Sequence, residues 1–134
     1  MKPHEIAEHL ATNLRHTIGP AVADPFARTQ AFMASVVLEK LAGQLRVAEA
    51  DERAARRDAV ALTDDLRALD VAPSAVRFLA AVRRLDTGSD AEMSHLVACV
   101  HADRTELGER FDHVLARVRR TVRANLDRQM AYCA

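Results

Sequence analysis

Apolar residues return every three or four positions along most of this chain, which is the period of an α-helix. No stretch sustains a strict alternation of apolar and polar residues, and no Asn-Gly or Asp-Gly turn separates two β-branched runs. The pattern therefore predicts an all-α protein. We expect a single-domain helical bundle of about five to six helices over residues 1–134.

The first predicted helix spans residues 3–18. Pro3 suits the first turn of a helix, because the N–H that proline lacks has no partner there. The apolar positions of this helix recur at steps of four, at Ile6, Leu10, Leu14 and Ile18. The pair Gly19-Pro20 is predicted to end it.

The second predicted helix, from Pro25 to about Ala48, is the most apolar in the chain. Its start signal is Asp24, a capping acid directly before a proline at the first helical position. With successive residues about 100° apart, the polar positions gather on one narrow side. That side holds Arg28, Ser35, Glu39 and Arg46, while Phe26, Met33, Val36, Val37, Leu41 and Leu45 spread over the rest. We therefore expect a central, mostly buried helix.

Three further segments complete the predicted bundle. Residues 51–69 form an amphipathic surface helix, with apolar positions at Ala55, Ala59, Leu62, Leu66 and Leu69. Ser74 is predicted to cap a short fourth helix that holds Val76, Leu79 and Val82 and ends before the stretch 86–90. Ser89 and Glu92 form a capping box for a fifth helix.

From Met93 almost to the end, the apolar spacing fits either one very long helix or two helices. We prefer two helices for two reasons. Asp103 and Glu106 are suited to form a second capping pair. Gly108 weakens a continuous helix by about 1 kcal/mol relative to alanine.

The charge balance argues against several classes of partner. Nineteen basic residues match nineteen acidic ones, so no overall field attracts nucleic acid or an anionic membrane. No segment approaches the ~18 consecutive apolar residues of a membrane span, and the start of the chain does not resemble a signal peptide. Cys99 and Cys133 are expected to be reduced thiols. We expect a cytoplasmic protein with neither nucleic acid nor membrane as its partner.

Six histidines raise the question of a metal site or of catalysis. His4 and His9 are five positions apart, not four as in a zinc protease helix, so they diverge by more than a quarter turn. His9 and His16 share a face but lie about 10 Å apart along the helix axis. His95 and Cys99 share a face, yet a thiol-imidazole pair also needs an orienting group and an oxyanion site. We expect no catalytic residue, metal or cofactor.

A stripe of mixed polarity on the second predicted helix is the first candidate for binding. Gln30, Met33, Val37, Lys40 and Gln44 recur at steps of three and four. Buried polar groups need partners, so the stripe is expected at a rim, a subunit seam or a ligand. In the alternative interpretation, Lys40 snorkels and the glutamines lie at the edge of the core. The partner or ligand interface candidates are Arg28, Gln30, Lys40 and Gln44.

The last predicted helix is locally basic, with Arg117, Arg119, Arg120, Arg123 and Arg128 within a dozen residues. These arginines spread around most of its non-apolar surface, as they do on a solvated face. Arg119, Arg120 and Arg123 are candidates to hold a phosphate-bearing ligand, such as a coenzyme A tail.

The segment from Leu14 to Leu45 reads LRHTIGPAVADPFARTQAFMASVVLEKLAGQL. Its first helix, proline-containing turn and long apolar helix resemble those of a family of small uncharacterised bacterial helical proteins. Members of that family are typically encoded beside aminoglycoside-phosphotransferase-like kinases and acyl-CoA dehydrogenases. One branch is similar to the small partner of the hydroxyacyl-CoA kinase of levulinic acid breakdown. The similarity covers about the first half of the chain.

The resemblance implies a noncatalytic accessory subunit that binds and completes a partner enzyme, an acyl-CoA-directed phosphotransferase. A helical domain without a nucleophile or nucleotide loop agrees with that expectation, because such a domain works through its surface. The alternative hypothesis is a homo-oligomeric helical bundle that binds a small ligand or a metal through its histidines.

Overall fold

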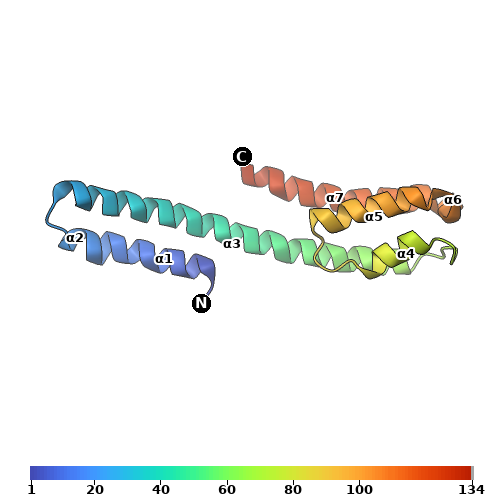
Figure 1. The fold of residues 1–134 in the computed structure, drawn as a ribbon, viewed down its shortest axis with the longest axis horizontal. Coiled ribbons are helices and arrows are strands. Elements are labelled where there is room, and N and C mark those ends of the chain that lie inside the picture. Colours follow the sequence, from blue (N-terminus) through green and yellow to red (C-terminus); the bar gives the residue numbers. More distant parts are fainter. Residues whose placement is uncertain (134) are drawn as a thin grey trace. The chain divides into compact units, whose positions relative to one another are not determined.

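The computed structural model describes residues 1–133, and side chains for residues 1–131. Its elements are α1 (Pro3–Asn13), a π-helix (Leu14–Ile18), α2 (Gly19–Ala21), α3 (Pro25–Arg67), α4 (Val76–Arg83), α5 (Asp90–Ala102), α6 (Arg104–Leu107), a 3₁₀-helix (Gly108–Arg110) and α7 (Phe111–Cys133) (Figure 1). Residues 1–133 include no strand. The predicted all-α class is confirmed, and five of the described α-helices have eight residues or more.

Contacts between residues divide the chain into two compact units. Unit 1 comprises Met1–Ala50, and unit 2 comprises Asp51–Ala134. The boundary lies inside α3, so this helix contributes residues to each unit. The single domain expected over residues 1–134 stays a prediction.

The second and third predicted helices are one helix in the structure. We expected a break between Ala48 and Asp51, but α3 is continuous from Pro25 to Arg67. No Gly or Pro lies near the expected break, and the alanines, glutamates and arginines there are strong helix formers. The start of α3 is as predicted, because Asp24 Oδ2 accepts a hydrogen bond from the Ala27 N–H at 3.0 Å.

The first helix does not end at Gly19-Pro20. The chain passes through one π-helical turn, in which the Gly19 N–H donates to the Leu14 carbonyl, and continues as α2 to Ala21. A Cβ atom at Gly19 would lie 2.6 Å from the Leu14 carbonyl oxygen, so only glycine fits this turn without displacing the backbone. The helical course therefore depends on a feature that the four-residue apolar spacing does not reveal.

The C-terminal part contains two main helices, as we preferred. α5 ends at Ala102 and α7 begins at Phe111, with Gly108 between them at a φ of 55°. Glycine tolerates this left-handed backbone better than any residue with a side chain. One half of the predicted capping box of α5 is present, since the Ser89 hydroxyl accepts a hydrogen bond from the Glu92 N–H at 3.3 Å. The other half is not, because the Ser89 N–H donates to the Thr87 hydroxyl and not to the Glu92 carboxylate.

Two other predicted caps are wrong, and tertiary structure explains why. Ser74 does not cap α4, because the N-cap residue is Ala75, which has no capping side chain. Asp103 does not cap the helix that follows it. Its buried carboxylate instead accepts a hydrogen bond from the Phe78 N–H at 2.8 Å, so a residue 25 positions away caps α4.

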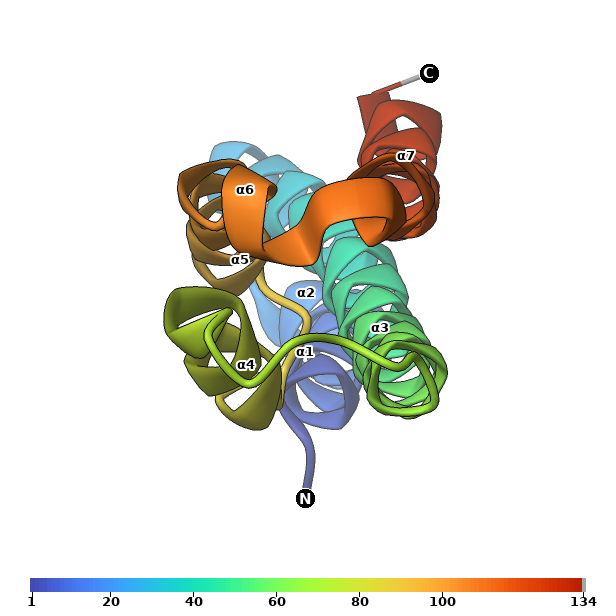
Figure 2. The same ribbon diagram turned by 90° about the vertical axis from the view of Figure 1, so that its right-hand side faces the viewer.

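Unit 2 has the larger core. It gathers side chains from the second part of α3 and from α4, α5 and α7, which surround a common centre when seen end-on (Figure 2). The side chains that are fully or almost fully buried there include Leu62, Leu66, Phe78, Leu96, Val100, Val114 and Val118. The apolar stripe predicted for residues 51–69 therefore faces this core.

Unit 1 is a helical hairpin in which α1 runs antiparallel to the first part of α3 (Figure 1). Small side chains are the buried ones: Ala7, Ala11, Ser35 and Ala42 are each 5% exposed or less. Such side chains let two helix axes approach closely. The buried Ser35 hydroxyl needs no tertiary partner, because it donates to the Phe32 carbonyl of its own helix at 2.6 Å.

The expectation of a central, mostly buried second helix is wrong. The narrow polar side of α3 faces the first helical segment: Glu39 pairs with Arg15 of the π-helix at 2.8 Å, and Arg46 pairs with Glu8 of α1. Most large apolar side chains of this part of α3 are exposed instead, although Leu38 and Leu45 are half-buried. The buried inner side of this part of α3 consists of the small residues Ser35 and Ala42, and the exposed ion pairs of Glu39 and Arg46 flank them. Hydrophobic spacing within α3 alone does not reveal this arrangement.

Candidate functional site

The face of α3 opposite α1 is the main candidate site. It carries a stripe at steps of four and three, which we call the outer stripe: Phe26, Gln30, Met33, Val37, Lys40 and Gln44. All six residues are exposed. Phe26 is 71% exposed, Met33 56% and Val37 63%, which are large fractions for apolar side chains. This exposure is compatible with the predicted position of the stripe at a rim, a subunit seam or a ligand. It does not fit the alternative interpretation, in which the glutamines lie at the edge of the core.

Further apolar side chains are exposed elsewhere in unit 1. On α3 they are Phe32, Val36, Leu41 and Val47, and on the first helical segment they are Ile6, Leu10 and Ile18, each 39% to 50% exposed. Monomeric proteins rarely leave so many large apolar side chains exposed in one small region. The hairpin therefore presents a surface suited to protein contact.

Within the outer stripe, Lys40 carries the one positive charge. Its side chain forms no ion pair or hydrogen bond with any described residue. Val37 and Met33, one and two turns before it on the same side of α3, place apolar surface beside it. Gln30 and Lys40 are thus brought onto one exposed face, as the stripe predicted, and so is Gln44.

Arg28, the fourth interface candidate, has a different place. Its guanidinium donates two hydrogen bonds to the Val22 carbonyl, from Nε at 3.1 Å and from Nη2 at 2.8 Å. It therefore fastens the connection between α2 and α3. Beside it lies a hollow of about 510 Å³. In this hollow the Arg15 guanidinium lies 5.2 Å from the centre of the Phe32 ring, a cation-π contact.

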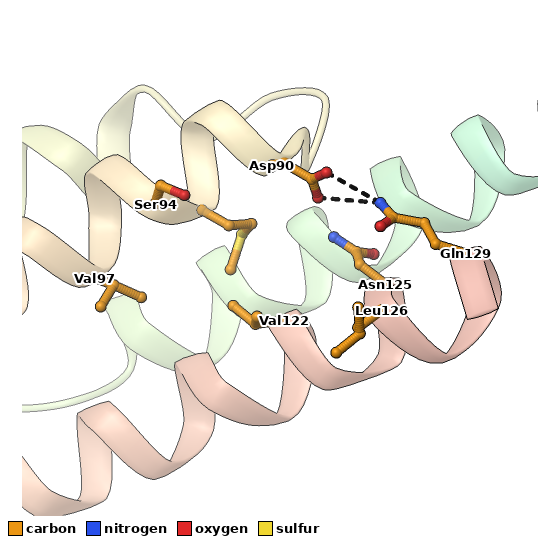
Figure 3. Close-up of a pocket in the computed structure, with 8 residues that line it drawn as sticks. Asp90, Ser94, Val97, Val122, Asn125, Leu126 and Gln129 are labelled. Carbon is orange, nitrogen blue, oxygen red and sulfur yellow. Dashed lines mark hydrogen bonds between the residues drawn. The ribbon is translucent and has the colours of Figure 1, made fainter.

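A second candidate site is a groove of about 400 Å³ between α5 and α7 (Figure 3). Its apolar lining comes from Met93, Val97, Val122 and Leu126, and its polar lining from Asp90, Ser94, Asn125 and Gln129. Figure 3 shows the amide of Gln129 directed at the carboxylate of Asp90, to which Nε2 donates at 3.1 and 3.2 Å. The carboxylate is thus already hydrogen-bonded across the groove.

One end of this groove is held by the loop before α5. The Asn125 side chain donates to the Gly88 carbonyl at 2.9 Å, and Gly88 has a φ of 69°. Burial raises the pKa of Glu92, but the hydrogen bonds that its carboxylate accepts outweigh burial and lower the pKa overall. The donors are the N–H groups of Asp86, Thr87 and Gly88 and the hydroxyl of Thr87. Glu92 therefore stabilises the loop, and it is not free to act as an acid or base.

The arginines proposed for a phosphate-bearing ligand lie on α7. Arg119, Arg120 and Arg123 are all exposed. None of them forms an ion pair with a residue that the structure describes. A phosphate site at these arginines stays a prediction.

The histidines and cysteines were considered as metal ligands and as a thiol-imidazole pair. In the described part of the chain, no three His, Cys, Asp or Glu side chains lie together as a group able to hold a metal ion. The predicted proximity of His95 and Cys99 is present, with Sγ 3.6 Å from Nε2. Cys99 is a free, buried thiol, as expected. The side chain of Cys133 lies outside the described residues.

Comparison with known proteins adds no relationship: no family model, curated protein or solved structure matches this chain. No helix in the described residues is both long and apolar enough to cross a membrane. The assignment of a function therefore depends on the two surfaces described above.

Sequence reasoning found the outer stripe but not its extent. Phe26 belongs to the same stripe, one step before Gln30, and the spacing of four could have identified it. The groove between α5 and α7 was missed altogether. Its lining residues on α5 lie more than 20 positions before those on α7, and packing in unit 2 sets the register of the two helices.

Proposed function

We propose that this chain is a noncatalytic binding subunit that associates with a partner enzyme through the outer stripe of α3. The observation that carries the proposal is the exposure of Phe26, Met33 and Val37 on a helix whose opposite side is occupied by α1. Removing apolar surface from water is the main driving force of protein association. A face with several large apolar side chains and few charges has the composition of an interface centre.

The partner that we propose is an acyl-CoA-directed phosphotransferase, and the site of action is the cytoplasm. Support comes from the resemblance of residues 14–45 to the small helical proteins encoded beside such kinases. The outer stripe lies within that segment and includes its three most exposed large apolar side chains, Phe26, Met33 and Val37. The chain would complete or stabilise the enzyme without contributing a reacting group.

The test is co-expression of the chain with a phosphotransferase-like kinase of the type encoded beside the similar helical proteins, followed by purification and kinase assay. We expect co-elution of the two proteins and a change in kinase activity. Val37→Asp should abolish co-elution, because a carboxylate would be buried in an apolar contact. Val60→Asp is the matched control: Val60 is also on α3 and 59% exposed, but it lies in unit 2. No co-elution and an unchanged kinase activity would refute the proposal.

A further inference from the structure

The charge pattern of unit 1 identifies the chemistry of the partner surface. Unit 1 contains five acidic residues, and every one is engaged within the unit. Glu5 accepts a hydrogen bond from the Lys2 N–H, and Asp24 accepts one from the Ala27 N–H. Glu8 pairs with Arg46, Glu39 with Arg15, and Glu49 with Lys2 and His4. Unit 1 therefore retains no carboxylate without a partner.

The five Lys and Arg residues of unit 1 are engaged in the same way, with one exception. Lys2, Arg15 and Arg46 pair with carboxylates, and Arg28 donates to the Val22 carbonyl. Lys40 forms no such bond with any residue between 1 and 131. The exception lies in the outer stripe, at the surface where we propose that the partner binds.

An ammonium group placed within an apolar contact is costly unless a carboxylate pairs with it. Covering Met33 and Val37 would also remove water from the neighbouring Lys40, so the covering surface must supply the missing negative charge. The spacing of the outer stripe repeats every seven residues, which is the spacing that a second helix packs against.

We infer that the occupant of the outer stripe is an apolar helix of the partner protein that carries an Asp or Glu carboxylate opposite Lys40. This inference rests on the proposed function and adds the chemistry that selects the partner. Opposite charges at this position stabilise the correct complex, and a partner without the carboxylate leaves Lys40 buried and unpaired.

A second copy of unit 1 does not satisfy these requirements. Parallel pairing of two outer stripes places Lys40 opposite Lys40, which is repulsive. Antiparallel pairing avoids the repulsion but supplies no free carboxylate, since all five acids of unit 1 are already bonded. The inferred occupant is therefore a helix of the partner protein and not a second copy of unit 1.

The composition of the chain makes a site-specific test available. Its only lysines are Lys2 and Lys40. A water-soluble carbodiimide joins a lysine amine directly to a carboxylate that already touches it. In the isolated chain, we expect Lys2 to couple to Glu49, whose carboxylate is 3.8 Å away, and Lys40 to remain uncoupled. In the co-purified complex with the kinase, Lys40 should couple to an Asp or Glu of the kinase, as read from peptide masses.

Charge variants give a second readout of the same contact. Lys40→Glu should weaken the complex about tenfold or more, because it places two carboxylates together. Lys40→Arg should retain binding while losing the crosslink. Arg53→Glu changes the net charge equally on an exposed part of α3 in unit 2, and binding should not change. Circular dichroism of each variant checks that the helices remain.

The outcomes separate the inference from the proposed function. A complex that forms, yet yields no Lys40 crosslink and tolerates Lys40→Glu, overturns the inferred carboxylate and leaves the binding function standing. Failure of the wild-type chain to bind the kinase refutes the proposed function, and the inference with it. A crosslink from Lys40 to a second copy of this chain overturns the inference of a different protein.

Discussion

Unit 1 and unit 2 use their apolar residues in opposite ways. Unit 2 buries large side chains such as Phe78 and Leu96 in a core to which α3, α4, α5, α6 and α7 all contribute. Unit 1 buries alanines and a serine and exposes Phe26 and Met33. The difference teaches that hydrophobic content alone does not measure how complete a fold is. The apolar side chains in the core of unit 2 pack against one another, whereas many large apolar side chains of unit 1 are exposed.

The largest effect should come from opening a cavity in unit 2. Leu96 has no exposed surface, and Leu96→Ala should lower the free energy of unfolding by about 3 kcal/mol, because the surrounding side chains cannot collapse fully. Val37→Ala in unit 1 should change it by less than about 0.5 kcal/mol. Urea unfolding followed by circular dichroism measures both variants. Similar losses for the two would mean that Val37 is covered in solution.

Gly88→Ala should have the next largest effect on the free energy of unfolding. A Cβ atom at this position would lie 2.4 Å from the Ala55 carbonyl oxygen, and the φ of 69° disfavours any side chain. We expect the free energy of unfolding to fall by about 2 kcal/mol, because the substitution strains the backbone and displaces the loop from α3. The same urea titration tests it. Gly43→Ala is the control, since its added Cβ meets no atom within 4 Å and should stabilise α3 slightly. Equal stability of Gly88→Ala and wild type would contradict the close approach.

Glu92→Gln should lower the free energy of unfolding by about 1 kcal/mol at neutral pH, because a charged acceptor of several backbone N–H groups is lost. Folding lowers the pKa of Glu92, so this stabilisation is present above the pKa of the unfolded chain. It is lost as the pH falls through the lowered pKa of the folded protein. Unfolding measured across the acid range should therefore show wild type and variant converging at low pH. A difference in the free energy of unfolding that stays constant with pH would contradict a stabilising role of the ionised Glu92 carboxylate.

The smallest effect on stability should accompany the largest effect on binding. Val37→Asp should change the free energy of unfolding by about 0.5 kcal/mol or less, since the side chain is 63% exposed. The same substitution should abolish co-elution with the kinase. Thermal unfolding beside the binding assay measures both properties. Lost binding together with a much lower melting temperature would assign Val37 to the fold of unit 1 instead of to an interface.

Local signals in the sequence predicted helix starts correctly where the deciding hydrogen bond joins neighbouring residues. Asp24 and Ser89 cap the helices they were expected to cap, because an N-cap bond joins residues only three apart. Asp103 was assigned wrongly for the complementary reason. Its side chain bonds to Phe78 across the fold, and no local pattern describes a contact between residues 25 positions apart.

The candidate site was predicted in the same partial way. Gln30, Met33, Val37, Lys40 and Gln44 were recognised as one stripe because helical spacing places them on one face. Arg28 was grouped with them as an interface candidate, yet its guanidinium is held by the Val22 carbonyl of the preceding loop. Which hydrogen bond a long side chain makes depends on the path of the loop, and that path is not encoded in the helical period.

The sequence by itself determined that this protein is helical, where most helices begin, and which residues share a face of each helix. These properties follow from backbone hydrogen bonding and from a period of 3.6 residues, which act over a few positions. Only the tertiary structure decided which face of α3 points inward. The side that carries Ser35 and Ala42 points inward because these small residues, with Ala7 and Ala11, let the two helices approach closely. Exposed ion pairs of Arg46 with Glu8 and of Glu39 with Arg15 flank this contact.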